Sequence, residues 1–234
     1  KKIKGWDNSG TKRVGFDIAD DGEDLCAIAY TEGNIIMGVD SWEGLEDELL
    51  KSATRTWKFA QEHGAEITYD SIGVGASCGA KLKELNIEAR KLNKDAWIAE
   101  YHAFNAGGAV EDPDRVFMKL PHTKILNKDH FENIKAQKWY DVAEKFRKTY
   151  EVIVYGAKHP VHELISINSE TISPKLLKQI KKELSCVQKD TSGRGKFMAE
   201  PKDKLRDRGI KSPNIADAII MSAMTPKKKA ATFF

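Results

Sequence analysis

Three aspartates that lie far apart in the sequence stand among apolar residues and are the side chains best suited to chemistry. They are Asp17 after Val14-Gly15-Phe16, Asp70 after Ile67-Thr68-Tyr69, and Asp217 within Asn214–Met221. A carboxylate in an apolar setting is unfavourable unless it is paired or binds a metal, and neighbouring carboxylates raise one another's pKa. A divalent cation relieves both effects. The three acids therefore predict a metal site, although each alone also suits a helix N-cap or a turn.

An all-oxygen ligand set of this kind favours Mg²⁺ or Mn²⁺. Two such ions about 4 Å apart can activate a water and stabilise the leaving oxygen of a phosphodiester. We therefore expect Asp17, Asp70 and Asp217 to be catalytic and to ligate two ions. Further acids and an amide lie close to them in sequence and are possible outer ligands or merely solvated groups: Asp20, Asp24 and Asn214.

The elements that must position these acids follow from apolar periodicity. Alternation predicts strands at 13–20, 24–31, 34–41 and 65–69, while three- and four-residue spacing predicts helices at 43–62 and 77–86. Residues 87–92 and 97–101 are candidates for further short strands, and 103–131 reads as loop. Later segments suggest helices at 132–149 and 172–184, a hairpin at 185–200, and a last helix that begins near Ser212-Pro213 and ends at Pro226.

Three antiparallel strands, a helix, a fourth strand and further helices are the order of an α/β domain of the ribonuclease H-like (RuvC- and integrase-like) class, a mixed sheet flanked by helices. In that order the first and fourth strands lie side by side. Asp17 and Asp70 are then neighbours, and the last helix brings Asp217 opposite them.

Charge is unevenly distributed along the 234 residues. Residues 171–234 hold 15 Lys and Arg against 6 Asp and Glu, a balance of +9, so with a net charge of +3 the first 170 residues carry −6. A basic surface beside an acidic site suits a polyanion such as double-stranded DNA. The expected DNA-binding residues are Arg194, Lys196, Lys202, Lys204, Arg206, Arg208 and Lys211. The alternative is a solvated face on which Asp203 and Asp207 pair locally.

Several classes of protein do not fit the composition. The sequence has no stretch of 18 apolar residues and no signal-peptide pattern at its start, so we expect neither a membrane protein nor a secreted one. Its three cysteines, Cys26, Cys78 and Cys186, lack C-x-x-C spacing, which argues against zinc and favours a reducing cytoplasm.

Gly15-Phe16-Asp17-Ile18-Ala19 with Gly22-Glu23-Asp24, Tyr69-Asp70, and Lys211-Ser212-Pro213-Asn214-Ile215-Ala216-Asp217-Ala218 together resemble the nuclease domain of large terminase subunits. These are the DNA-packaging motors of tailed bacteriophages, and the headful-packaging branch is the most similar. The resemblance covers about 13–225. It implies metal-dependent cleavage of double-stranded DNA with little sequence specificity, metal ligation by Asp17, Asp70 and Asp217, and action in the cytoplasm of an infected bacterial host.

The resemblance also implies partners. A complete large subunit has an N-terminal ATPase domain and works with the portal and the small terminase subunit. The sequence has no G-x-x-x-x-G-K-[ST] phosphate loop, since 71–79 lacks the lysine. We therefore expect an isolated nuclease domain at 13–225, a linker remnant at 1–12 and a basic flexible tail at 226–234.

Three alternatives remain open at the level of sequence. Glu200-Pro201-Lys202 offers an E-x-K pattern of restriction-type nucleases, but that interpretation leaves Asp217 unused. A resolvase- or integrase-like nuclease would use the same acids on the same fold. A DNA-binding module without catalysis would explain the basic segment but not the acids.

Overall fold

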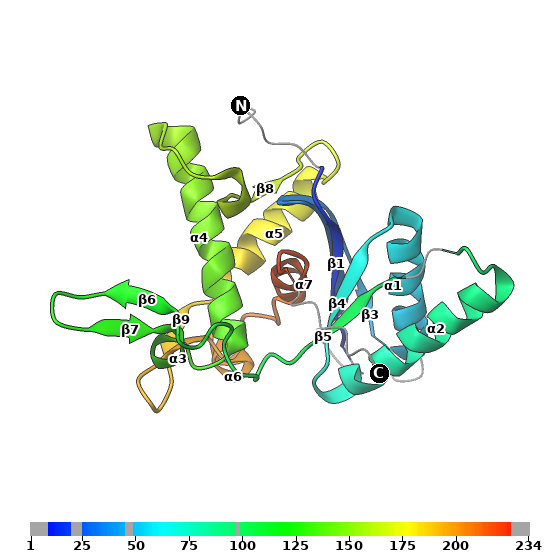
Figure 1. The fold of residues 1–234 in the computed structure, drawn as a ribbon, viewed down its shortest axis with the longest axis horizontal. Coiled ribbons are helices and arrows are strands. Elements are labelled where there is room, and N and C mark those ends of the chain that lie inside the picture. The colour runs from blue at the N-terminus through cyan, green and yellow to red at the C-terminus, as the bar shows by residue number, and fades with distance from the viewer. Residues whose placement is uncertain (1–8, 20–24, 45–48, 97–98, 226–234) are drawn as a thin grey trace.

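A computed structural model describes residues 9–19, 25–44, 49–96 and 99–225. Its centre is a six-stranded mixed sheet with the order β5-β4-β1-β2-β3-β8 (Figure 1). Strands β1, β2 and β3 are antiparallel, whereas β4 is parallel to β1, β5 to β4, and β8 to β3. The strands are β1 (Lys12–Asp17), β2 (Leu25–Glu32), β3 (Ile35–Glu43), β4 (Glu66–Asp70), β5 (Tyr101–Phe104) and β8 (Ser166–Ile167). The predicted mixed α/β sheet, with its first and fourth strands adjacent, is confirmed.

Helices cover both faces of this sheet (Figure 1). On one face lie α1 (Leu49–His63) and α2 (Cys78–Leu92), the latter preceded by a 3-10 turn, η2 (Gly73–Ser77). On the other face α7 (Asn214–Ser222) packs directly on β1 and β2 and is backed by α4 (Ile134–Tyr155) and α5 (Pro174–Cys186). The sheet therefore separates two hydrophobic cores.

Residue alternation along the strands assigns each side chain to one core. Val14 and Phe16 of β1 pack with α1 and α2, whereas Ala27 and Ala29 of β2 pack with α7. Because side chains alternate between the faces of a strand, Gly15 and Asp17 belong to the face that α7 covers. Period-two alternation thus puts the first acid under the last helix.

Gly15 allows that helix to come unusually close. A Cβ atom at Gly15 would overlap the carbonyl oxygen of Ala218 and the backbone nitrogen of Ser222, both in α7. Only glycine leaves room for the helix backbone here. The glycine of the Gly15-Phe16-Asp17 motif therefore fixes the distance between α7 and β1.

Two small hairpins extend from the main body beside α4 (Figure 1). They are β6 (Val116–Lys119) with β7 (Lys124–Leu126), and β9 (Lys189–Thr191) with β10 (Phe197–Ala199). An aromatic cluster joins them, in which the ring of His130 stacks on Phe117 at 3.8 Å and on Phe197 at 5.8 Å between centroids. The short elements α3 (Asn127–His130), η3 (Val161–Glu163) and α6 (Lys202–Asp207) complete the chain.

Some sequence predictions need correction. Residues 87–92 are the end of α2 rather than a strand, because Leu85 and Ala89 continue the helical spacing from Leu82 and face the same core. The strand expected at 97–101 is β5, at 101–104, and the stretch 103–131 contains a hairpin and a short helix as well as loop. The last helix ends at Ser222, before Pro226.

The other predicted elements are confirmed with shifted bounds. The first three strands, the helix that ends at His63, the strand that ends at Asp70, the two later helices and the hairpin at 185–200 are all present. Residues 1–8 of the expected linker and the whole tail 226–234 lie outside the described residues. None of the helices in the described part of the chain is long and apolar enough to cross a membrane.

Candidate active site

Asp17 and Asp70 are the last residues of adjacent parallel strands, β1 and β4. The register pairs Gly15 with Thr68 and Phe16 with Tyr69, so one step further it brings Asp17 alongside Asp70. Asp17 is buried, whereas Asp70 is half-buried and its Oδ1 accepts a 3.0 Å hydrogen bond from the Ile72 backbone nitrogen. The carboxyl ends of these two strands therefore form the floor of the candidate site.

Asp217 reaches the same place from α7, in its first turn. The helix follows Pro213, which offers no side-chain cap, and Glu183 of α5 supplies one instead: its Oε2 accepts a 3.1 Å hydrogen bond from the Ala216 nitrogen. A carboxylate is favourable at a helix N-terminus. Glu183 thus fixes the start of the helix on which the buried Asp217 stands.

The acids interact electrostatically. Burial raises the pKa of Asp17 well above its ordinary value, and the nearby carboxylates of Asp217 and Asp70 raise it further, while Lys202 and Lys135 oppose the shift. The pKa of Asp70 is also raised, mainly by burial. A cluster of carboxylates that resists ionisation is a common mark of a functional site.

Two residues of α4 hold Asp217 in place. The ammonium of Lys135 lies 3.0 Å from both carboxylate oxygens of Asp217, and the indole nitrogen of Trp139 donates a 3.1 Å hydrogen bond to Oδ1. Lys135 and Trp139 are four residues apart and so share one face of the helix. Both oxygens of Asp217 therefore already have partners.

Asn214, the amide expected as an outer ligand, lies one turn before Asp217. Its side chain is buried, and its Oδ1 finds no hydrogen-bond partner among the described residues. Buried polar atoms are rarely left without a partner. An amide oxygen and carboxylate oxygens are the donors that a hard divalent cation prefers. Asp20 and Asp24 lie outside the described residues.

The donor chemistry fits Mg²⁺ or Mn²⁺, but the side chains are not gathered around a single point. Within 9–19, 25–44, 49–96 and 99–225, no three His, Cys, Asp or Glu side chains are close enough together to hold one metal ion. The nearest cation to Asp217 is instead the ammonium of Lys135. Ion binding therefore requires the carboxylates, and this lysine, to rearrange.

The basic residues predicted to contact DNA lie in the β9–β10 hairpin, in α6 and in the segment that follows α6. Several have local partners: Arg194 pairs with Glu132, Lys204 with Asp190 at 2.6 Å, and Arg206 with Asp203 at 3.2 Å. Lys196 donates a hydrogen bond to the Lys128 carbonyl, and Arg208 pairs with the buried Glu200. Lys211 is exposed. Lys202, the first residue of α6, is among the main charges that lower the pKa of both Asp17 and Asp70.

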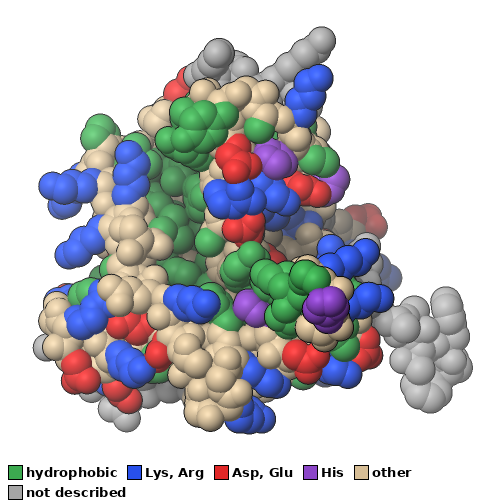
Figure 2. All heavy atoms as spheres, turned by 90° about the vertical axis from the view of Figure 1, so that its left-hand side faces the viewer, with side chains coloured by type: hydrophobic (Ala, Val, Ile, Leu, Met, Phe, Trp, Pro, Cys, Tyr) green, Lys and Arg blue, Asp and Glu red, His purple; other side chains and the backbone are tan. Residues whose placement is uncertain are grey.

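Acidic and basic side chains are interspersed over the side of the molecule that α4 and the β6–β7 hairpin form (Figure 2). On α4, Arg147 pairs with Glu144 and Glu151. His159, which follows the helix, lies 2.8 Å from Glu151. This side is therefore not a uniformly basic surface.

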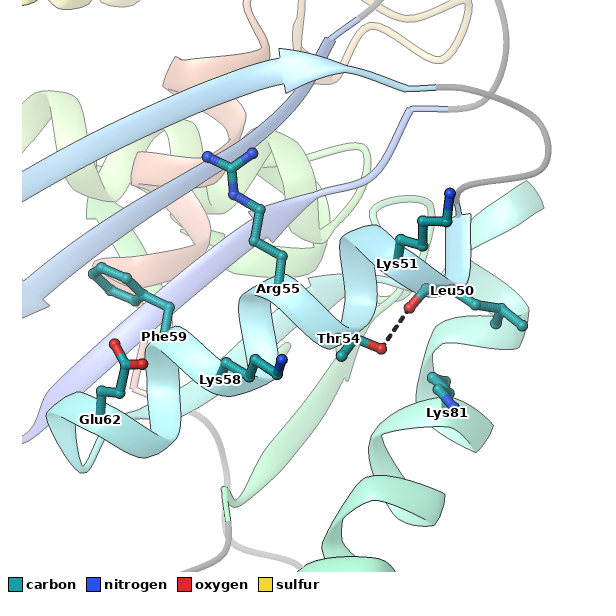
Figure 3. Close-up of a pocket in the computed structure, with 8 residues that line it drawn as sticks. All are labelled: Leu50, Lys51, Thr54, Arg55, Lys58, Phe59, Glu62 and Lys81. Carbon is teal, nitrogen blue, oxygen red and sulfur yellow. Dashed lines mark hydrogen bonds between the residues drawn. The ribbon is translucent and has the colours of Figure 1, made fainter.

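A groove of about 650 Å³ lies along α1, the helix on the opposite face of the sheet from α7 (Figure 3). Half of its lining residues are basic, and none of the three acids takes part: Leu50, Lys51, Thr54, Arg55, Lys58, Phe59, Glu62 and Lys81. Arg55 is engaged by Asp40 at 2.6 Å and stacks over Trp42. The groove lacks the carboxylates that the chemistry of the site demands.

The sheet order and the helices on both faces define the ribonuclease H-like fold of terminase nuclease domains. In structure the chain is similar to the nuclease domain of the large terminase subunit gp2 of bacterial virus Sf6. The K428A mutant of that domain with manganese and beta-thujaplicinol is 27% identical, with a TM-score of 0.79 over 95% of this chain and 91% of that one. The resemblance that the motifs predict is confirmed by these neighbours.

Two further structures support the comparison. The Sf6 nuclease domain without the mutation is 26% identical, with a TM-score of 0.77 over 95% of this chain and 91% of that one. The large terminase nuclease of thermophilic phage G20c with bound magnesium is 12% identical, covers 91% and 80% of the two chains with a TM-score of 0.54, and shows the fold alone. No protein-family model and no curated protein matches the sequence.

Sequence reasoning missed Lys135, Trp139 and Glu183. Each acts from a helix distant in sequence on the first turn of α7, with separations of 82 residues for Lys135 and 33 for Glu183. No local motif marks them. The one available signal was the sequence Lys135-x-x-x-Trp139, a cation and an indole donor on one helix face.

Proposed function

We propose that this chain is a metal-dependent endonuclease that cleaves double-stranded DNA with little sequence specificity during viral genome packaging. The observation that carries the proposal is the convergence of Asp17, Asp70 and Asp217 at the ends of β1, β4 and the start of α7. The manganese, calcium and magnesium in the neighbouring terminase nuclease structures support it.

Asp17, Asp70 and Asp217 would hold two Mg²⁺ or Mn²⁺ ions, with Asn214 as an outer ligand. When bound, such ions lower the pKa of an attacking water and stabilise the leaving oxygen. Trp139 orients Asp217 through its hydrogen bond, and Glu183 keeps the helix start in place. Partners of this kind orient the side chains that ligate a metal.

The DNA would lie across the acids and the β9–β10 hairpin and α6, along Arg194, Lys196, Lys202, Lys204, Arg206, Arg208 and Lys211. Phosphate contacts position a duplex without reading its sequence, which suits nonspecific cleavage. Of these basic residues, Lys202 lowers the pKa of both Asp17 and Asp70. Arg208 is engaged by the buried Glu200, so we expect it to act mainly by supporting α6.

In the infected bacterial cytoplasm the domain would act as part of a longer large subunit, joined to an ATPase domain and working with the portal and the small terminase subunit. These partners rest on the family resemblance.

Plasmid cleavage with Mg²⁺, Mn²⁺ or EDTA tests the function. Wild-type protein should convert supercoiled DNA to nicked and linear forms only with metal. Each of the variants Asp17→Asn, Asp70→Asn and Asp217→Asn should lower the cleavage rate by more than about 100-fold. Losing a residue that only supports a metal ligand costs up to about 100-fold, so a larger loss identifies a ligand itself. The exposed Asp95→Asn is the matched control and should cleave normally.

Other outcomes separate the alternatives. DNA binding without cleavage under any metal condition would identify a binding module rather than an enzyme. A strong preference for branched over linear duplex DNA would favour a resolvase-like nuclease. Wild-type rates in an aspartate variant would remove that residue from the site.

A further inference from the structure

Lys135 occupies the position where a cation is most needed in this site. Its ammonium contacts both oxygens of Asp217 at 3.0 Å, and the carboxylates of Asp17 and Asp70 act on it as well. A lysine ammonium is ordinarily charged at neutral pH. Lys135 is therefore a counter-ion held directly against the carboxylate of Asp217.

A metal ion that binds Asp217 must approach this ammonium closely. Asp217 has two oxygens: Oδ1 already accepts from Trp139, and Lys135 spans both. Two cations about 4 Å apart repel strongly in a partly buried site, where water screens them poorly. The ion must either displace the ammonium of Lys135 or bind beside it against its repulsion. Both cost free energy and so reduce the affinity for the metal ion.

The lysine is able to move. Its side chain keeps 30% of its surface exposed, compared with 11% for Asp217. Lysine carries its charge on a flexible four-carbon stem and binds phosphate as a point charge. The ammonium can thus leave Asp217 for a phosphate oxygen while the backbone of α4 stays in place.

We propose that Lys135 is a built-in counter-cation that keeps metal affinity low until a DNA phosphate takes over the lysine. The inference rests on the proposed nuclease function. It couples metal and DNA binding: the metal binds well only when DNA supplies negative charge for the displaced ammonium. Lys135 takes no part in the chemical step; it links the binding of the metal ion to the binding of DNA.

Replacing the lysine tests this directly. The apparent Kd for Mn²⁺, measured by calorimetry or electron paramagnetic resonance without DNA, should fall at least about tenfold in Lys135→Met. Lys135→Gln, which keeps a polar end, should also bind Mn²⁺ more tightly. Lys135→Arg keeps the charge and should retain the weak wild-type affinity.

Lys138→Met is the matched control. Lys138 lies about one turn further along α4, is buried, and pairs with Glu111 rather than with the three acids. Its loss should lower thermal stability and leave the Kd for Mn²⁺ unchanged. The comparison separates removal of the counter-cation from general damage to α4.

A second measurement uses a short DNA duplex with Ca²⁺ as the probe ion. The duplex should increase Ca²⁺ affinity more in wild type than in Lys135→Met, by at least about fivefold, because only wild type has a lysine to transfer. An equal increase in both proteins would overturn the coupling.

The remaining outcomes are distinct. If wild type binds Mn²⁺ and Lys135→Met and Lys135→Gln bind it equally or more weakly, Lys135 is a structural anchor and the inference is wrong. If neither wild type nor any Lys135 variant binds Mn²⁺ or Ca²⁺, with or without DNA, the proposed function itself fails.

Discussion

The two faces of the central sheet differ in the side chains that contact their nearest helices. The face under α1 and α2 carries large apolar side chains, among them Phe16, Trp57 and Leu82. The face under α7 carries small residues at the contact, Gly15, Ala27 and others, together with the charged site. Away from that contact the α7 face also buries large side chains, such as Ile36 and Ile219, so the two faces differ at the contact between sheet and nearest helix rather than in apolar bulk.

Two apolar cores help the fold tolerate a costly site. Buried apolar side chains on each face of the sheet stabilise it at roughly 25 cal/mol per Å² of buried surface. The α7 face in addition brings a helix start within reach of two strand ends, so the site depends on the close contact between α7 and the sheet.

The largest expected effect comes from filling the close approach. Gly15→Val places a side chain against the backbone of α7, which cannot yield as a flexible side chain would. We expect a loss of unfolding free energy above about 3 kcal/mol, beyond the usual range for overpacking, with loss of cleavage. Urea unfolding followed by circular dichroism measures it.

Gly38→Ala is the control for that change. A Cβ atom at Gly38, in β3, meets nothing within 4 Å. The variant should be as stable as wild type or more stable by about 0.4–1 kcal/mol. Equal destabilisation by both glycine substitutions would show that the α7 contact has no special role.

A smaller effect is expected from removing charge on the same face. The folded-state pKa of Asp17 is raised above its ordinary value of 3.8, so the folded protein binds this proton more tightly than the unfolded chain. The contribution of Asp17 to stability should thus rise as the pH falls through its folded-state pKa toward 3.8, and should be least favourable at higher pH.

Asp17→Asn removes this dependence. In EDTA at neutral pH the variant should be more stable than wild type by more than the 0.5 kcal/mol or so of neutral substitutions. The difference should shrink as the pH falls toward 4. Denaturant titrations at several pH values measure it, with the exposed Asp203→Asn as control. A variant less stable than wild type at neutral pH would contradict the repulsion among the acids.

The smallest effect on stability, and a clear one on DNA binding, is expected from the basic residues. Lys202→Ala with Lys204→Ala should lower the slope of log K against log salt by about two, one for each lost phosphate contact. Lys58→Ala with Lys81→Ala, from the groove on α1, should leave the slope unchanged. Equal slopes in both pairs would remove α6 from the proposed DNA path.

The sequence predicts the parts of the site that arise from local pattern. Alternation in 13–20 and the order of the elements are sufficient to place Asp17 beside Asp70, and the Ser212-Pro213 start is sufficient to put Asp217 in the first turn of a helix. Period and order are local or topological properties, so they can be read from one sequence.

The sequence does not reveal what depends on tertiary contact. Lys135 looks like any lysine at the start of a helix, and its pairing with Asp217 exists only once α4 packs on α7. The hairpin in 116–126 was missed for a similar reason. Its strands are three and four residues long, and an aromatic cluster that includes Phe117 and Phe197 links it to a hairpin far away in sequence.

Helix α4 has a mechanical consequence. It runs 22 residues, about 33 Å at 1.5 Å per residue, from Lys135 at one end to an exposed apolar end with Tyr150, Ile153, Val154 and Tyr155 at the other. Packed helices move as stiff rods. A tilt of about 2° around the far end shifts the near end by roughly 1 Å over this length. That is a large fraction of the 3.0 Å between Lys135 and Asp217, so a small tilt of α4 changes the spacing of the charges at the acids.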